Sequence, residues 1–393
     1  MAAVSWHHLL HRVIVRIAII TESFPPDVNG VAHCVLRVAE HLVRRGHHPL
    51  VIAPRPADSL ARPDRAVPYP VARMPSLPMP GYPGFRIATA GSSLRAALTH
   101  HGAELVHLAS PFVLGGGGAV AAERLGLPLI AVYQTDVPGY ARVYRLGPAS
   151  QALAWRRLRR IHNAADRTLA PSTSAAASLH EHGIERVWLW ARGVDTIRFD
   201  PAKRSERLRA ELAPGGEVLA GYVGRLAPEK RVELLGRVAA LPGVRLVIVG
   251  SGPAEVALRR AIPGAVFLGQ RQGEELASIY ASLDVFVHSG PHETFGQTLQ
   301  EAAASGLPVV APAAGGPLDL VGHGSTGFLV PPGDPGALAD AVATLAADPG
   351  LRAEQGRAAR QRVLGRSWPA LVDELIAHYE AVLRTASAVE VPA

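Results

Sequence analysis

Short runs of Val, Ile, Leu and Ala alternate with longer amphipathic segments over nearly the whole chain. Such short apolar runs, bounded by polar residues, Gly or Pro, predict buried strands, and the amphipathic stretches between them predict helices. Parallel sheets that are covered by helices on both faces produce this pattern, because their strands are buried on both sides. The alternation therefore predicts an α/β fold built from βαβ units.

The predicted strands fall into two series. The first series comprises residues 15–20, 49–53, 104–109, 128–133, 167–171 and 186–190. The second series comprises residues 218–224, 245–250, 265–269, 284–288, 308–312 and 327–331. Residues 199–216, between the two series, are polar, charged and bounded by Pro and Gly. We therefore predict two Rossmann-like, doubly wound domains, residues 1–195 and 196–366, that face each other across a cleft and are joined near residues 195–201.

The two ends of the chain carry different signals. Residues 1–14 have no pattern that would bury them, and we predict that they form a disordered extension. Residues 367–386 place Leu371, Leu375, Tyr379 and Val382 at helical spacing. This stretch is predicted to be a helix that packs back on the first domain.

The composition narrows the class of protein. Hydrophobic residues make up 48% of the 393 residues, and the mean hydropathy is +0.15, which is typical of a core-rich globular protein. Cys34 is the single cysteine, so no internal disulfide can form and a reducing, cytoplasmic location is expected. The net charge of +7 leaves room for an anionic partner, such as a phosphorylated substrate, a nucleic acid or a membrane surface.

Two carboxylates flank a predicted helix start in the segment HETFGQTLQEA, residues 292–302. A helix that begins at Gly296 or Gln297 presents unsatisfied amides and a partial positive charge, which together bind anions. Helical side chains lean toward the N-terminus, so Glu301 points to the same end, and Glu293 lies in the preceding loop. Both can accept hydrogen bonds from paired hydroxyls on either side of a bound diphosphate. The alternative is that Glu301 complements the helix dipole and Glu293 is an ordinary loop residue.

A second candidate segment is GRLAPEKR, residues 224–231, which follows a predicted strand. The chain has only two lysines, Lys203 and Lys230, and Lys230 lies in this loop. Arg225 and Lys230 can clamp a diphosphate and neutralise the charge that develops on it as a leaving group, without a metal ion. The alternative is a solvated turn.

Further loops at predicted strand ends add weaker candidates. Gly30 and the VGSGP segment at residues 249–253 allow a ligand to approach the backbone closely. Gln134, Asp136 and Tyr140 are suited to sugar hydroxyls, or else they are turn residues around Pro138. No Asp-x-Asp pair occurs, so no metal site is expected, and the four glycines at 115–118 are interpreted as a close-packed turn between strand and helix.

The Glu-x7-Glu spacing, GRLAPEK and the Gly30 loop together resemble the retaining glycosyltransferase family 4, which has the GT-B fold. The resemblance extends from Val15 to about Ala386. More narrowly, TESFPPDVNGV, YQTDVPGYA, ADRTLAPS, ARGVD, DVFVHSGPHETFGQTLQEAAASGLPVVAP and GRSW are similar to the actinobacterial GDP-mannose-dependent α-mannosyltransferases that act on glycolipids.

This resemblance implies roles for individual residues. Arg225, Lys230 and Glu293 would be catalytic, the first two at the diphosphate and the third at the donor sugar. The donor-binding residues would be Gly30, Ser251, Gly252, Gly269, Gln270, Arg271, Thr294, Phe295, Gly296, Gln297 and Glu301, with Glu301 at the ribose and residues 269–271 at the base. The acceptor-binding residues would be Asn29, Gln134, Asp136, Tyr140 and Arg192. Two positions depart from the commoner family pattern: Gln134 stands where many relatives carry a histidine, and Arg192 replaces the Asn of PNGVD.

The resemblance also implies a reaction. Residues 1–195 would bind the acceptor and residues 196–366 the sugar nucleotide, with mannose passing from GDP-mannose, as a substrate, to a lipid or glycan hydroxyl. No metal or cofactor is expected. The transfer would retain configuration by a front-face route, in which the leaving phosphate oxygen accepts the acceptor's proton.

Several other interpretations stay open. The same architecture serves UDP-glucose and UDP-N-acetylglucosamine transferases, sugar-nucleotide epimerases and phosphorylases, although a pyridoxal phosphate enzyme would have only Lys230 for its Schiff base. The segment WRRLRRIH at residues 155–162 is the nearest approach to a nucleic-acid-binding stripe. We interpret that segment as a basic helix face, either solvated or resting on anionic lipid at the cytoplasmic face of the plasma membrane, and we expect no nucleic acid partner.

Overall fold

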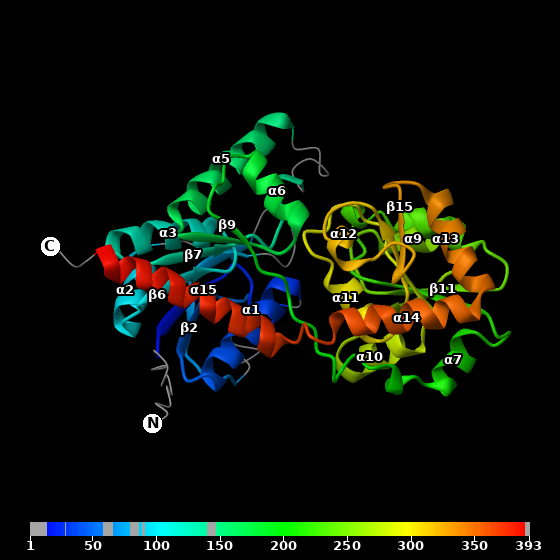
Figure 1. Ribbon diagram of the computed structural model, residues 1–393. Coiled ribbons are helices and arrows are strands. Elements are labelled where there is room, and N and C mark those ends of the chain that lie inside the picture. The colour runs from blue at the N-terminus through cyan, green and yellow to red at the C-terminus, as the bar shows by residue number, and fades with distance from the viewer. Residues whose placement is uncertain are drawn as a thin grey trace, which may run out of the picture. The chain divides into compact units, whose positions relative to one another are not determined.

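The computed structural model describes residues 14–27, 29–57, 66–78, 86–88, 91–139 and 147–389. The chain divides into two compact units, Met1–Ile130 with Thr385–Ala393, and Ala131–Arg384. Figure 1 colours the chain by residue number and labels its elements. Most of the predicted extension, residues 1–13, lies outside the described residues.

A seven-stranded sheet begins in the first unit. In sheet order its strands are β3 (Val71–Met74), β2 (His48–Pro54), β1 (Arg16–Ile20), β6 (Leu105–Leu108), β7 (Leu129–Val132), β8 (Arg167–Ala170) and β9 (Val187–Leu189). β1 pairs in parallel with β2 and β6, and β8 pairs in parallel with β9. The boundary between the units falls within β7. All six strands predicted for the first series are confirmed to within one residue or two at each end.

Three short strands were not predicted. β3 adds to the edge of the sheet, and β4 (Ser76–Pro78) pairs antiparallel with β5 (Arg86–Ala88). Only the last residue of β3 is buried, and β4 and β5 are three residues each. Strands this short and this exposed leave no apolar run in the sequence, so the hydrophobic pattern does not reveal them.

The helices of the first unit are α1 (Gly30–Arg44), α2 (Ser92–His101) and α3 (Val113–Leu125). The prediction that residues 115–118 form a turn is wrong, because these four glycines lie inside α3. A Cβ atom on Gly115 would lie 2.2 Å from the carbonyl oxygen of Ser110, and one on Gly118 would lie 2.6 Å from Cδ1 of Ile20. The glycines therefore let the helix pack closely against the sheet, a reason that the sequence pattern does not reveal.

The second unit contains a six-stranded sheet. In sheet order its strands are β12 (Val266–Gly269), β11 (Val244–Val249), β10 (Val218–Val223), β13 (Val285–Val287), β14 (Val309–Pro312) and β15 (Gly327–Val330). All of its pairings are parallel. The second predicted series is thereby confirmed. Carboxyl ends of parallel strands meet at one edge, so the loops that follow these strands lie together.

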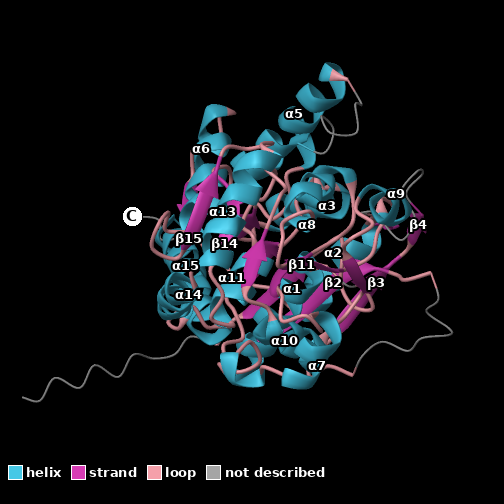
Figure 2. Ribbon diagram, turned by 90° about the vertical axis from the view of Figure 1, so that its right-hand side faces the viewer, coloured by secondary structure: helices cyan, strands magenta, loops and turns pink. Residues whose placement is uncertain are grey.

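Helices cover both faces of this sheet (Figure 2). The helices of the second unit are α5 (Pro148–Ala164), α6 (Thr173–Glu181), α7 (Glu206–Leu212), α8 (Gly236–Ala239), α9 (Glu255–Ala261), α10 (Gly273–Ser282), α11 (Gln297–Ala304), α12 (Pro317–Leu320), α13 (Pro335–Ala347), α14 (Pro349–Val363) and α15 (Trp368–Val389). The short 3-10 helices are η1 (Pro201–Lys203), η2 (Pro228–Lys230) and η3 (Val232–Leu235).

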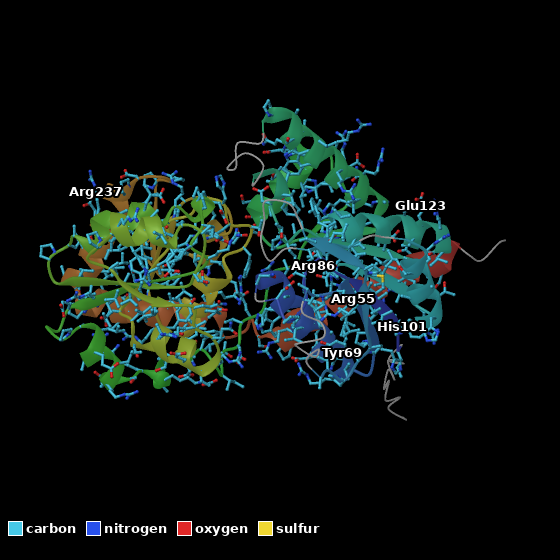
Figure 3. All side chains as sticks on the ribbon, turned by 180° about the vertical axis from the view of Figure 1, so that it is seen from behind. Arg55, Tyr69, Arg86, His101, Glu123 and Arg237 are labelled. Carbon is cyan, nitrogen blue, oxygen red and sulfur yellow. The ribbon has the colours of Figure 1, made fainter. Side chains whose placement is uncertain are left out.

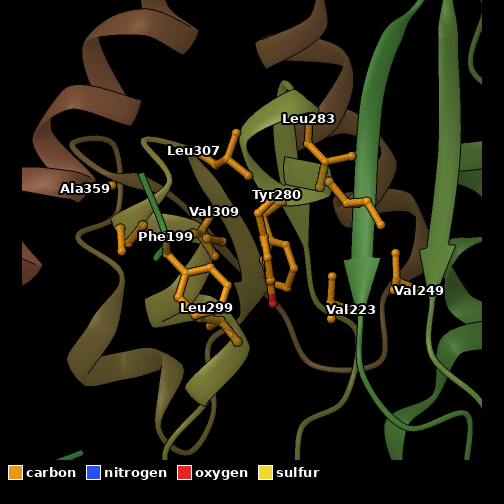
Figure 4. Close-up of a cluster of buried hydrophobic side chains, with 14 of the residues drawn as sticks. Phe199, Val223, Val249, Tyr280, Leu283, Leu299, Leu307, Val309 and Ala359 are labelled. Carbon is orange, nitrogen blue, oxygen red and sulfur yellow. The ribbon is translucent and has the colours of Figure 1, made fainter. Parts of the chain in front are cut away.

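Alternate residues of each strand enter different cores, as a pleated strand requires. Leu219 and Val223 of β10 join a cluster with residues of α10, α11 and α14, whereas Ala220 and Tyr222 join a cluster with residues of α13. Figure 4 shows Tyr280 of α10 in the first cluster, together with Leu299 of α11 and Phe199. The doubly wound architecture predicted for the second series is confirmed.

The last helix contacts residues of the first predicted domain. The indole nitrogen of Trp190 donates a hydrogen bond to the carbonyl oxygen of Leu371 at 2.7 Å, and Arg167 lies 2.9 Å from Nδ1 of His378. The amide of Val194 donates a hydrogen bond to the carbonyl oxygen of Arg366, just before the helix, at 2.9 Å. The domain boundaries at residues 195 and 366 stay a prediction. Among the described helices, none is both long enough and apolar enough to cross a lipid bilayer.

Candidate active site

The six-stranded sheet reverses its direction of growth between β10 and β13. The chain proceeds outward from β10 through β11 to β12 and then returns to the opposite side of β10 as β13. Ligands of doubly wound sheets bind outside the carboxyl ends of the strands at this reversal. Arg225 and Lys230 follow β10, and Glu293 follows β13. The structure thus brings the two predicted motifs together at the expected position.

Two ion pairs occupy this position. Nζ of Lys230 contacts Oε1 of Glu293, and Nη2 of Arg225 contacts Oε1 of Glu229. Glu229, which was not predicted as a site residue, is 1% exposed. Burial alone would raise the pKa of Glu293, but the charge of Lys230, with smaller contributions from His288 and Arg192, holds that pKa below its usual value. Both residues that are predicted to bind the diphosphate are therefore held in place by carboxylates.

The two loops are also joined through their backbones. Oγ of Ser289 donates to the carbonyl oxygen of Lys230 at 2.9 Å. A Cβ atom on Gly290 would lie 3.1 Å from Cα of Lys230, closer than most such contacts. The small residues after β13 therefore let the loop after β10 approach, and they fix Lys230 beside the Glu293 loop.

Glu301 lies on α11, which begins at Gln297 as the sequence predicts. Its Oε2 accepts a hydrogen bond from the hydroxyl of Tyr280 at 3.2 Å. Burial raises the pKa of Glu301 to about 7, against smaller lowering contributions from Tyr280, Gln297 and Arg198. The residue before the helix, Gly296, has a φ of 102°, which a side chain would strain.

The raised pKa of Glu301 predicts that donor affinity increases with pH. A ribose diol donates two hydrogen bonds to an ionised carboxylate, so donor binding favours the ionised form and lowers this pKa. Below pH 7 the carboxyl of the free protein is protonated, and the affinity should fall by up to about tenfold per pH unit. Calorimetry with GDP-mannose between pH 5.5 and 8 measures this slope, and the slope should vanish in Glu301→Gln. A wild-type affinity that does not change with pH would contradict the assignment of Glu301 to the ribose.

Five further residues that are predicted to bind the donor lie at or after the ends of β11 and β12, at the same sheet edge. Ser251 and Gly252 follow β11, and Gly269 ends β12, with Gln270 and Arg271 after it. A Cβ atom on Gly252 would lie 2.3 Å from the carbonyl oxygen of Leu226, so glycine is required for the loops to approach. Gln270 is exposed, and Nε of Arg271 lies 3.1 Å from Oε1 of Glu275. Their binding roles stay predictions.

Residues in the segments that follow β7, β8 and β9 hold the loop that carries Glu293 and the start of α11. Oγ1 of Thr294 donates to the carbonyl oxygen of Gln134 at 3.2 Å, and Oγ of Ser172 donates to that of Thr294 at 2.7 Å. Nε2 of Gln297 donates to the carbonyl oxygen of Gly193 at 3.1 Å. Phe295, predicted as a donor contact, is 2% exposed and packs in the core.

Two predicted acceptor residues contact each other. Nη2 of Arg192 donates to Oε1 of Gln134 at 2.9 Å, and both residues are buried. Nε2 of Gln300 donates to the carbonyl oxygen of Arg192 at 2.8 Å, which ties this pair to α11. The two positions that depart from the commoner family pattern therefore form one hydrogen-bonded unit.

The other predicted acceptor residues are placed differently. Oδ1 of Asp136 accepts hydrogen bonds from the hydroxyl of Tyr133 at 3.1 Å and the amide of Gly139 at 2.9 Å, as a turn residue does. Asn29 caps α1 by accepting from the amides of Val31 and Ala32, and Gly30 is the first residue of that helix. Tyr140 lies outside the described residues. The acceptor roles stay predictions.

Two observations concern sites elsewhere. Within the described ranges, no three His, Cys, Asp or Glu side chains gather as metal ligands would, and the absence of a metal stays a prediction.

In the first unit, a cavity of about 380 Å³ is lined by Tyr69 and His101, both labelled in Figure 3. Its lining residues Arg16 and His48 begin β1 and β2, so it lies at the amino ends of the strands.

Sequence reasoning missed His288, Glu229 and Tyr280. His288 follows β13 and is 1% exposed, and its ring stacks on that of Tyr222 with centroids 6.2 Å apart. Nε2 of His288 lies 3.5 Å from Oε1 of Glu293. A histidine that ends an apolar run just before a candidate loop is a signal that could have identified it.

Comparisons with known proteins identify the family of this chain. Residues 28–198 match the family described as Glycosyltransferase Family 4, and residues 203–362 match Glycosyl transferases group 1. A GDP-mannose-dependent alpha-mannosyltransferase from Mycobacterium tuberculosis (strain CDC 1551 / Oshkosh) is 52% identical over 370 residues, 94% of this chain and 97% of that protein. One from Corynebacterium glutamicum is 44% identical over 94% of this chain and 89% of its own length. Among solved structures, sucrose-phosphate synthase from Thermosynechococcus elongatus superposes with a TM-score of 0.78 at 24% identity, covering 94% of this chain and 100% of that chain.

Proposed function

Because this chain belongs to glycosyltransferase family 4 and has the GT-B fold, we propose that it transfers mannose from GDP-mannose to a hydroxyl of a glycolipid or another glycan. The observation that carries the donor assignment is the 52% identity over 97% of a relative that is named for GDP-mannose-dependent mannosyl transfer. The same name at 50% and 44% identity favours GDP-mannose over a UDP-sugar.

The site chemistry supports transfer from a sugar nucleotide. When the bond to the sugar breaks, negative charge grows on the leaving diphosphate, and fixed cations lower the barrier most where that charge develops. Arg225 and Lys230 supply those cations at the reversal of the sheet. Glu293 holds a hydroxyl of the transferred sugar, and Glu301 holds the ribose.

The acceptor step follows from the same charges. The two carboxylates of the proposed site, Glu293 and Glu301, hold hydroxyls of the sugar and the ribose, and neither is proposed as a nucleophile. The acceptor hydroxyl therefore approaches the face of the sugar that the diphosphate leaves. The departing phosphate oxygen takes the proton of that hydroxyl as the new glycosidic bond forms. The product then keeps the configuration of the donor sugar.

A transfer assay tests this proposal. Purified protein is incubated with GDP-mannose, UDP-glucose or UDP-N-acetylglucosamine and with a membrane lipid extract as acceptor. GDP release with incorporation of mannose into the lipid fraction is the expected result. Incorporation from a UDP-sugar alone would overturn the donor assignment.

The lipid acceptor leads to a proposed membrane-contact surface on α5. Arg156, Arg157, Arg159 and Arg160 are exposed on this helix, and Leu153 beside them is 66% exposed. Arg156 and Arg159 line a cavity of about 500 Å³ together with Trp155, whose ring stacks on His182 with centroids 3.6 Å apart. Clustered arginines beside an exposed apolar residue suit the surface of an anionic membrane.

Reversing two of these charges should weaken membrane binding. Each basic residue near an anionic surface contributes about 1 kcal/mol, so Arg156→Glu with Arg159→Glu should reduce vesicle affinity at least about tenfold, most clearly at low salt. Arg207→Glu is the control, because Arg207 is 90% exposed on a different helix, α7. Sedimentation with phosphatidylglycerol vesicles measures the effect. Equal sedimentation of all three proteins would contradict a role for α5.

A further inference from the structure

One carboxylate oxygen at the proposed site has two neighbouring nitrogens. Oε1 of Glu293 contacts Nζ of Lys230, and the same atom lies 3.5 Å from Nε2 of His288. The side chains of Lys230 and Glu293 are each 17% exposed, and His288 is 1% exposed. Lys230 holds the oxygen in the structure, while His288 stands at the limit of hydrogen-bonding distance.

This arrangement conflicts with the role proposed for Lys230. In the proposed complex the ammonium group of Lys230 binds the diphosphate, and the carboxylate of Glu293 binds the donor sugar. In the structure these two groups contact each other instead. A diphosphate that binds Lys230 draws on the charge and the N–H donors that now serve Glu293, and this weakens the contact between Lys230 and Glu293. Glu293 therefore acts as an internal anion that the donor has to displace.

His288 is placed to receive the displaced carboxylate. Its ring is held against Tyr222, so its position is fixed while Lys230, on a flexible stem, can turn away. Burial lowers the pKa of His288 to about 4, so the ring is neutral, and in the tautomer that carries its hydrogen on Nε2 it can donate one hydrogen bond to Glu293. The other charged groups that act on Glu293 are Lys230 and Arg192, and Lys230 is the one that the donor diphosphate would recruit.

We propose that donor binding moves Glu293 from Lys230 to His288, which makes His288 a positioning residue for the carboxylate that holds the donor sugar. This inference rests on the proposed function in assigning the sugar to Glu293, but the exchange itself requires only that Lys230 binds a diphosphate. The exchange couples the two halves of the donor, because Glu293 is released toward the sugar only when the diphosphate has taken Lys230.

Removing the internal anion should tighten the binding of a diphosphate that carries no sugar. We expect Glu293→Gln to bind GDP about fivefold more tightly than the wild type, as loss of a competing ion pair predicts, while turnover of GDP-mannose falls at least tenfold. The gain should disappear in the Lys230→Ala background, because no ammonium group is then left to release. Glu233→Gln is the control, because it removes the same charge from an exposed pair with Arg231 in the adjoining segment.

Calorimetry with GDP and with inorganic pyrophosphate measures these affinities. Unchanged or weaker binding by Glu293→Gln overturns the exchange, as does a gain that persists in the Lys230→Ala background or also occurs in Glu233→Gln. Failure of the proposed function has a different signature: the wild type then transfers no mannose, whatever the variants bind. If only Glu293→Gln binds pyrophosphate detectably, the exchange is supported even in that case.

Variants of His288 test the receiving position. His288→Phe preserves the stacking surface for Tyr222 but cannot donate to the displaced carboxylate, so it should lower kcat about tenfold and weaken GDP binding while the melting temperature stays unchanged. His288→Gln restores a donor and should recover part of kcat. A loss of GDP affinity in step with a lower melting temperature would assign His288 a purely structural role and overturn its part in the exchange.

Discussion

Lys230→Ala is expected to reduce transfer from GDP-mannose by about a hundredfold to a thousandfold. Removing one preorganised group that stabilises developing charge typically costs about 2.7 to 4 kcal/mol of transition-state stabilisation. Lys230 follows the strand at which the sheet reverses, and its backbone is fixed by Ser289 and by close contact with Gly290. Initial rates at saturating donor measure the loss.

The other lysine provides the matched control. Lys203 pairs with Glu274, and both side chains are at least partly exposed, at 28% and 71%. Lys203→Ala removes the same charge from the same unit and should leave turnover within about twofold of the wild type. Equal losses in both variants would show that net charge, rather than the position of Lys230, supports activity.

Glu301→Ala is expected to weaken GDP and GDP-mannose by the same factor, about tenfold to a hundredfold. A hydrogen bond to a charged group contributes about 1.5 to 3 kcal/mol, and the ribose is common to both ligands. Calorimetry with the two nucleotides measures the two losses side by side.

Glu293→Gln gives the contrast for this prediction. The proposed partner of Glu293 is the transferred sugar, so the GDP affinity of this variant should not fall. If Glu301→Ala spares GDP while Glu293→Gln abolishes its binding, the roles of the two carboxylates are reversed.

The sequence pattern predicted most of the strands and the meeting of the two candidate motifs at one sheet edge, because both depend on local signals. Buried parallel strands are continuous apolar runs, and loops at their carboxyl ends must share one edge. The start of α11 at Gln297 is encoded by the glycine before it. Lys230 was recognised because lysine is rare in this chain.

What the sequence could not predict depends on contacts between distant segments. Glu229 and Lys230 are neighbours in the chain, but they have different partners. The carboxylate of Glu229 is buried against Arg225, whereas Lys230 contacts Glu293, 63 positions away. The pairing of Gln134 with Arg192 likewise joins β7 to the segment after β9. The glycines of α3 were predicted to form a turn, because the contact that requires glycine at position 118 is with Ile20 of β1, outside the helix.

The position of β12 at the outer edge of its sheet bears on how donor preference can be redesigned. The loops that hold Lys230 and Glu293 are interlocked through their backbones, so changes there disturb the transfer chemistry. Gln270 and Arg271, at the predicted base-binding position, follow the outermost strand, where Gln270 is exposed and Arg271 pairs with Glu275 only four residues away. On the predicted assignment of residues 269–271 to the base, we expect substitutions at these two positions to alter nucleobase selectivity without disturbing the loops that hold Lys230 and Glu293, and a library confined to them tests whether a different nucleotide can be accepted.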